Sequence, residues 1–180
     1  MIKSLIVLMV LNIYLFAQER IEIGQHAFIG IVENNMQYLA RIDSGARITS
    51  LHAFNIKLEG PKALIPAVSP TKLTGYPFKK KVKNEQYRRH LGRMISFDTV
   101  NERGEVRHMK TRVVNVTRVR NAQGVEYRYV IRLGIKYGEL VKFKEVNLRD
   151  RDHMTYKLLI GRNWLDNDFV IKTDLDLIKK

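Results

Sequence analysis

Short stretches that are apolar, or that alternate apolar and polar residues, recur along this chain between turn-forming residues. Interpreted as strands, they are 27–32, 36–42, 50–58, 94–100, 105–113, 114–120, 124–133, 139–148, 156–160, 169–172 and 175–178. One short helix is predicted at 162–167. Short strands at regular spacing, with almost no helix, predict an all-β sandwich or barrel.

Length and composition limit the classes of protein that fit this pattern. The chain has 180 residues, of which 45% are hydrophobic, which suits one domain with its own core. It has no Cys, so disulfides, thiolate nucleophiles and thiolate metal sites are excluded. The formal net charge of +14 indicates an anionic partner, such as nucleic acid, a lipid surface, an anionic polymer or an acidic peptide.

The N-terminus has the layout of a secretory signal peptide. Lys3 precedes a nearly unbroken apolar run that ends at Ala17, and polar residues follow from Gln18. We therefore predict a signal peptide at 1–17, a single domain at 18–180, and a periplasmic or secreted protein. The alternative is an uncleaved anchor, which would add a membrane as partner. Export argues against nucleic acid, although a nucleic-acid-binding module stays open as a minor alternative.

The segment 60–93 differs in composition from the rest of the chain. It contains all four prolines and many Lys and Arg but a single acid, Glu85. We predict a long irregular loop, with a short helix near 85–91. The loop is either a solvated insertion or a basic rim that attracts an acidic ligand.

Asp43, Ser44 and Gly45 follow directly after the predicted strand 36–42. Each of these residue types favours a turn, through side-chain hydrogen bonds to the backbone or through free backbone angles. The tripeptide can be an ordinary surface turn. It can also hold a carboxylate at a strand end, ready for acid–base chemistry.

A second segment, "LLIGRNWL" at 158–165, has the pattern of a buried strand that enters a helix. Together with the strand and Asp-Ser-Gly-Ala, it resembles the retropepsins, the single-lobe aspartic proteases of retroviruses. The longer pattern is similar to a bacterial retropepsin-like family labelled ATP-dependent zinc proteases, over roughly 23–58 and 95–178. The resemblance implies a closed single-lobe barrel with one short C-terminal helix, in which 60–93 is an insertion.

This chain contains no sequence motif for binding the zinc or the ATP that the family label names. The five histidines include no pair with metal-ligand spacing and no His-Glu-x-x-His. There is also no Gly-rich phosphate loop. We therefore predict no cofactor and no metal, and a zinc peptidase is the less favoured enzyme class.

The resemblance implies an aspartic endopeptidase in which two carboxylates share one proton. The chain contains only one Asp-Ser/Thr-Gly, so the second carboxylate would be Asp43 of another copy in a two-fold homodimer. Ser44 and Gly45 would orient the carboxylates, and Gly161 would let its strand pass close behind the loop. Ala46 has no hydroxyl that could donate a hydrogen bond to Asp43 and favour its charged form. The pair of carboxylates should therefore titrate higher, and activity should move toward neutral pH. A pH–rate profile that peaks below about 4 would contradict this.

One position departs from the retroviral pattern, which has an Asp where this chain has Arg47. Arg47 would repel Arg162 unless an acid lies between them. Arg162 and the next residue, Asn163, are the other supporting residues that the resemblance implies. Asp150 or Asp152 is the candidate acid, and a solvated turn is the alternative for both. By order along the chain, the hairpin 94–113 would be the flap over the site, with Gly104 near its tip.

Family context suggests a substrate class. Members are often associated with ATP-grasp ligases that add glutamate or similar residues, and an acidic peptide substrate would fit the basic charge. The competing hypothesis is a catalytically silent module that binds an anionic peptide or polymer. Replacing Asp43 by Asn separates the two, because it should abolish cleavage and leave binding nearly unchanged.

Overall fold

The computed structural model describes residues 20–60, 87, 89–121 and 124–175. The predicted signal peptide lies outside these residues, as do most of the predicted loop at 60–93 and most of the strand predicted at 175–178. Within the described part of the chain, no helix is long and apolar enough to cross a membrane.

The described residues form strands and one short helix. The strands are β1 (Ile21–Ile23), β2 (His26–Ile31), β3 (Met36–Ile42), β4 (Thr49–His52), β5 (Phe54–Leu58), β6 (Met94–Val100), β7 (Val106–Arg112), β8 (Asn115–Asn121), β9 (Gly124–Tyr137), β10 (Leu140–Arg149), β11 (Leu158–Ile160) and β12 (Phe169–Ile171). The helix is α4 (Arg162–Leu165). The prediction of an all-β protein with a short C-terminal helix is confirmed.

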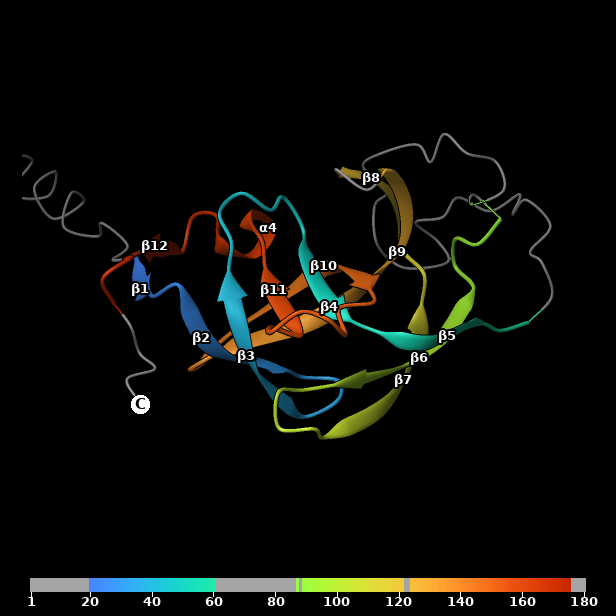
Figure 1. The fold of residues 1–180 in the computed structure, drawn as a ribbon, viewed down its shortest axis with the longest axis horizontal. Helices are drawn as coiled ribbons and strands as arrows, with labels where there is room; N and C mark the ends of the chain where they lie inside the picture. The colour runs from blue at the N-terminus through green and yellow to red at the C-terminus, as the bar shows by residue number, and fades with distance from the viewer. Residues whose placement is uncertain (1–19, 61–86, 88, 122–123, 176–180) are drawn as a thin grey trace, which may run out of the picture.

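The main sheet closes into a ring of strands (Figure 1). Its order is β10-β4-β11-β3-β2-β9-β8, and β9 also pairs with β10. A three-stranded sheet, β5-β6-β7, lies below the ring in Figure 1, and β1 pairs with β12 at one side. The ring is closed because β9 is long enough to pair with β2, β8 and β10.

The predicted strand 50–58 is two strands in the structure. β4 pairs with β10 and β11 in the main sheet, whereas β5 pairs with β6 in the smaller sheet. The chain changes sheets at Ala53, and Asn55 has a φ of 52°, where the pairing of β5 is irregular. The apolar pattern alone could not locate this change, because apolar residues stand on both sides of it, Leu51 before and Phe54 and Ile56 after.

Alternation along the strands fills the interior of the ring. In β2, Ala27, Ile29 and Ile31 are buried and the side chains between them are more exposed, as the period of two in a strand requires. Trp164 of α4 is fully buried and stacks on Phe169, with 4.3 Å between ring centroids. This packing seats the short helix on the end of the ring.

β3 and β11 lie side by side and run parallel, with Ile42 opposite Ile160. The residues that follow the two strands, Asp43 and Gly161, therefore lie next to each other although they are distant in sequence. The candidate site is built at this junction, at the top of the ring in Figure 1.

Candidate active site

The carboxylate of Asp43 is held by the loop that it begins, residues 43–48, which we call the Asp43 loop. The Asp43 N–H donates to the carbonyl oxygen of Ile160 at 2.9 Å, which ties the loop to the end of β11. The N–H groups of Gly45 and Ala46 donate to Asp43 Oδ1 at 2.9 and 3.1 Å. One carboxylate oxygen is thus oriented by two backbone donors in a half-buried position.

Ser44 has no comparable contact within one chain. Its side chain is exposed, and among the described residues its hydroxyl makes no hydrogen bond to Asp43. Backbone groups therefore provide the orientation of the carboxylate within one copy.

Gly161 packs against the back of the Asp43 loop. A Cβ at this position would lie 2.7 Å from the carbonyl carbon of Ile48 and 2.9 Å from the carbonyl oxygen of Ala46. Both are backbone atoms that cannot turn aside, and real Cβ contacts are essentially never so short. The close approach of strand and loop therefore requires glycine.

The first residues of α4 fasten the other side of the loop. The N–H of Arg162 donates to the Ala46 carbonyl at 2.8 Å, and that of Asn163 donates to the Arg47 carbonyl at 3.2 Å. Asn163 Oδ1 accepts hydrogen bonds from the N–H and the hydroxyl of Thr49, at 2.9 and 3.0 Å. Its Nδ2 donates to the Glu145 carbonyl at 2.7 Å, so this side chain joins α4, β4 and β10.

The structure does not bring Asp152 to Arg47 or Arg162. Asp152 forms an ion pair with Lys157 at 3.8 Å. Lys157 precedes β11 whereas Arg162 follows it, so the acid lies at the opposite end of that strand. Arg47 and Arg162 are exposed, and backbone hydrogen bonds hold the loop to the helix in place of an ion pair.

The predicted flap hairpin also lies elsewhere. Gly104 is in the turn between β6 and β7, with a φ of +80°. In that turn, the Glu102 carboxylate accepts hydrogen bonds from the N–H groups of Leu39 and Lys157, at 2.9 and 2.7 Å. These contacts hold the turn against the middle of β3, on the side of the ring away from the Asp43 loop (Figure 1). The β8–β9 hairpin instead extends toward the side that carries the loop.

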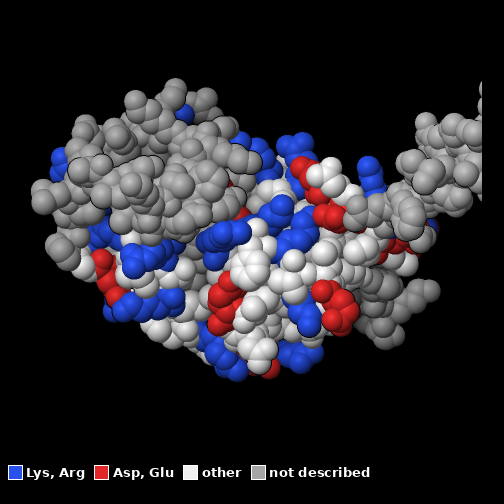
Figure 2. Space-filling model, turned by 180° about the vertical axis from the view of Figure 1, so that it is seen from behind, with Lys and Arg blue, Asp and Glu red and all other residues white. Residues whose placement is uncertain are grey.

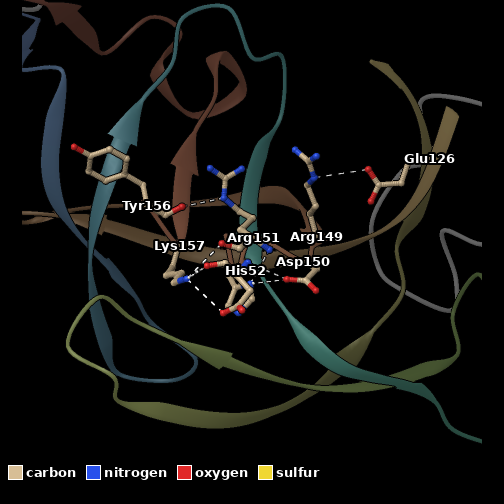
Figure 3. A network of polar contacts seen from close by, with 8 residues as sticks. His52, Glu126, Arg149, Asp150, Arg151, Tyr156 and Lys157 are labelled. Atoms are coloured by element: carbon tan, nitrogen blue, oxygen red, sulfur yellow. Dashed lines mark hydrogen bonds and ion pairs between the residues drawn. The ribbon is translucent and has the colours of Figure 1, made fainter. Parts of the chain in front are cut away.

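Arg151 is a candidate functional residue that the sequence analysis did not identify. It lies in residues 150–157, which we call the Arg151 loop, and is only 7% exposed. Its N–H donates to His52 Nδ1 at 2.8 Å, and its Nε donates to the Tyr156 carbonyl at 3.0 Å (Figure 3). The recurrent Arg and Asp in "LRDRD" was the available signal, but only the fold shows which of them is buried.

Charge around this loop is mainly positive. Burial lowers the pKa of Arg151, and neighbouring arginines lower it further, whereas the negative charge of Asp43 raises it. The arginines concerned are Arg149, Arg128 and Arg41. Burial, and then the charge of Lys157, lower the pKa of His52. Residues from β3, β9 and β10 thus place several cations around Arg151, which also lies within electrostatic reach of Asp43.

Metal-ligating side chains are not gathered at this site. The ranges that the structure describes contain no group of three or more His, Asp or Glu residues placed to hold a metal ion. The residues at the site are suited to proton transfer and to binding anions.

A family model described as "RimB-like: Retropepsin-like aspartic endopeptidase RimB" matches residues 80–180, which is more than half of the chain. The chain belongs to this RimB-like family. The matched residues include the Arg151 loop, Gly161 and α4, whereas Asp43 precedes them. The place of Asp43 beside Gly161 therefore rests on the pairing of β3 with β11.

Curated relatives of this RimB-like chain carry the name probable alpha-L-glutamate ligase. The protein from Parasynechococcus marenigrum is 35% identical over 127 residues, which cover 68% of this chain and 21% of the relative. The protein from Shewanella halifaxensis is 29% identical over 136 residues, which cover 73% of this chain and 24% of the relative. The chain therefore spans less than a quarter of the length of these relatives.

A solved structure shares the fold. The Legionella pneumophila protein Lpg0085, whose function is unknown, matches 90% of this chain and 100% of its own, with a TM-score of 0.61 and 22% identity. At this level of identity the match shows the fold of the RimB-like chain and nothing about its chemistry.

Proposed function

We propose that this protein is an aspartic endopeptidase that works as a homodimer, with one Asp43 from each copy. The observation that carries the proposal is the Asp43 carboxylate, which accepts hydrogen bonds from the N–H groups of Gly45 and Ala46, in a loop whose backbone packs against the glycine that follows β11. Membership of a retropepsin-like family supports the same reaction class. A dimer is required because the sequence contains a single Asp-Ser/Thr-Gly.

The reaction follows from two carboxylates that share one proton. The ionised Asp43 takes a proton from a water molecule, and the water oxygen attacks the carbonyl carbon of the peptide bond. The protonated Asp43 of the other copy donates to the carbonyl oxygen, which gives a tetrahedral intermediate. The first Asp43 then gives the proton that it took from water to the amine nitrogen as the C–N bond breaks. The second Asp43 takes back a proton from a hydroxyl of the tetrahedral intermediate, so both carboxylates return to their starting state.

We propose the β8–β9 hairpin as the element that covers the substrate. It extends on the same side of the ring as the Asp43 loop, whereas the turn of the β6–β7 hairpin is bound to β3 and Lys157 through Glu102. A segment that closes over a substrate has to move, and a turn fastened by two hydrogen bonds to another sheet is poorly suited to that.

Acidic peptides are the proposed substrate class. The formal net charge of +14 favours binding of anions. Arg151, with other arginines around it, brings part of that charge within electrostatic reach of Asp43. The curated relatives are named for a ligase of glutamate, which suits a peptidase domain acting on glutamate-containing chains. The predicted signal peptide leads us to propose that cleavage takes place in the periplasm or outside the cell.

The test is cleavage of peptide libraries by the full chain, compared with the Asp43→Asn variant. We expect the wild-type protein to cut acidic peptides between pH 4 and pH 8. The variant should lose at least about 100-fold in rate, because it removes the acid–base pair. Mass spectrometry identifies the cut sites, and a chelator should have no effect.

A catalytically silent binding module is the second candidate, because the same cations would hold an acidic peptide without cleaving it. Under that function, neither protein would cut any peptide and both would retain acidic peptides equally. Sedimentation at increasing concentration tests the dimer separately, since an active monomer would contradict a site shared between two copies.

A further inference from the structure

Arg151 is a buried arginine without an acidic partner among the residues that the structure describes. Its side chain is 7% exposed, and no ion pair of the described residues includes it. A buried charge costs several kcal/mol unless it is compensated, so unpaired guanidinium groups of this kind are rare. The cost indicates that the group is held for a ligand.

The arginines near Arg151 either have a carboxylate nearby or are exposed. Glu126 binds Arg128 through two hydrogen bonds, at 2.9 and 2.6 Å, and lies 3.7 Å from Arg149. One carboxylate therefore serves two of the cations. Arg41 is exposed at the end of β3 next to the Asp43 loop. Arg151 is the member of the group that is both buried and without a carboxylate among the described residues.

The guanidinium of Arg151 has a defined orientation. Its Nε is occupied by the Tyr156 carbonyl at 3.0 Å, which leaves the two terminal nitrogens as donors. In Figure 3 the group points away from His52 and Lys157, toward the end of the ring that carries the Asp43 loop. The negative charge of Asp43 raises the pKa of Arg151, which agrees with a guanidinium that points toward the Asp43 loop. Two parallel donors of a guanidinium match the two oxygens of one carboxylate.

We propose that Arg151 is the specificity-determining residue of the site, and that its terminal nitrogens bind a side-chain carboxylate of a peptide held beside Asp43. The inference rests on the proposed function, which supplies the peptide. The Arg151 loop is built to present this group, because His52 fixes the Arg151 backbone and Tyr156 fixes its Nε. The expected ligand is a Glu side chain rather than Gln, since an amide offers only one acceptor oxygen.

The effect of the protein's overall positive charge on peptide binding has to be distinguished from the effect of the Arg151 contact. Figure 2 shows Lys and Arg side chains over much of the face opposite to that of Figure 1, so any acidic peptide will be attracted to some degree. Arg107 supplies a matched control, because it is an exposed arginine of β7 whose side chain donates to the carbonyl of the adjacent Val106. Arg107→Gln and Arg151→Gln remove the same charge from different places.

Binding is measured in the Asp43→Asn background, which does not cleave the ligand. The probes are a fluorescent pentaglutamate peptide and the matching pentaglutamine peptide, titrated by anisotropy onto the full chain. We expect Arg151→Gln to weaken pentaglutamate binding by roughly 10- to 100-fold, the range for a hydrogen-bonded charge pair. Pentaglutamine binding should change by less than about twofold, and Arg107→Gln should change both by less than about twofold.

Equal effects of Arg151→Gln and Arg107→Gln on pentaglutamate would overturn the assignment. So would an Arg151→Gln variant that weakens both peptides alike, because that indicates a structural role. If Arg151→Gln does not fold, Arg151→Lys replaces it. Lysine keeps the charge but not the paired donors, and should lose the preference for glutamate over glutamine by several-fold. An unchanged preference in that variant would also overturn the assignment.

Cleavage by the protein with Asp43 intact separates this inference from the proposed function. If no peptide is cut, yet pentaglutamate binding depends on Arg151, the carboxylate site stands and the peptidase function fails. If peptides are cut and the ratio of kcat/KM for glutamate over glutamine peptides is the same in Arg151→Gln as in the wild type, the peptidase function stands and the role of Arg151 fails.

Discussion

The Asp43 loop and the Arg151 loop flank the same strand, β11, but they are stabilised in opposite ways. The Asp43 loop is held mainly by backbone hydrogen bonds, to Ile160, Arg162 and Asn163, and by the absence of a side chain at Gly161. The Arg151 loop is held by side chains, among them the buried His52. One loop positions a reactive group, and the other keeps a charge out of water.

The difference indicates how the two proposed roles of the site, cleavage and carboxylate binding, could be altered separately. Backbone contacts define position closely, which suits a carboxylate that would meet its counterpart from another copy in the proposed dimer. A side-chain network depends on protonation, because protonation decides which of its groups donate and which accept hydrogen bonds. Substitutions near the Asp43 loop should therefore disturb geometry, and those near the Arg151 loop should disturb charge and its dependence on pH.

The largest effect on folding is expected from Gly161→Ala. The new Cβ would lie 2.7 Å from the Ile48 carbonyl carbon, so either the loop or β11 must move. We expect a loss of roughly 1–3 kcal/mol or more in the free energy of unfolding, measured with urea, together with loss of cleavage. Gly30→Ala is the control, since its nearest contact would be an ordinary 3.5 Å. Equal losses in the two variants would contradict the close approach described for Gly161.

A smaller effect is expected from Asn163→Ala. It removes the acceptor for both donors of Thr49 and the donor to the Glu145 carbonyl. Leaving these partly buried groups without a partner should cost about 1–3 kcal/mol in the free energy of unfolding. Asp166→Ala, at the exposed residue that follows α4, should cost less than about 0.5 kcal/mol. If the two variants unfold at the same urea concentration, Asn163 does not join the three elements in solution.

The smallest effect is a pH dependence that originates in the Arg151 loop. Burial keeps the pKa of His52 below its ordinary 6.5, and Nδ1 accepts the Arg151 N–H, so the folded protein holds this ring neutral. The unfolded chain binds a proton at His52 as the pH falls through 6.5 and the folded chain does not, so the free energy of unfolding decreases with falling pH. The slope from this group is at most about 1.4 kcal/mol per pH unit.

Urea unfolding of the wild type and of His52→Gln, between pH 8 and pH 5.5, isolates this contribution. The variant should lose less stability over the range than the wild type. His153→Gln, an exposed change in the same loop, should behave like the wild type. An identical pH dependence in His52→Gln and the wild type would show that the ring is not held neutral by its surroundings.

The fold class could be predicted because it depends on local pattern. Strands such as β2 and β3 bury every second side chain, and turn-forming Asn or Asp residues follow them, so their bounds can be predicted from neighbouring residues. The short helix after Gly161 was predictable for the same reason. The division of 50–58 into β4 and β5 was not, because the choice between two sheets is made by distant strands.

The sequence by itself determined where a carboxylate follows a strand and where a glycine precedes a helix, since both are written in neighbouring residues. Only the tertiary structure decided what surrounds that carboxylate. Asp150 or Asp152 was the candidate acid for Arg47 and Arg162, but Asp152 is paired with Lys157. Gly104, which was expected over the site, lies in the same turn as Glu102, which is hydrogen-bonded to β3. Burial of Arg151 arises from contacts with His52 and Tyr156, which are contributed by separate segments. The proposed role of Arg151 in specificity depends on these surroundings, and they come together only when the chain folds.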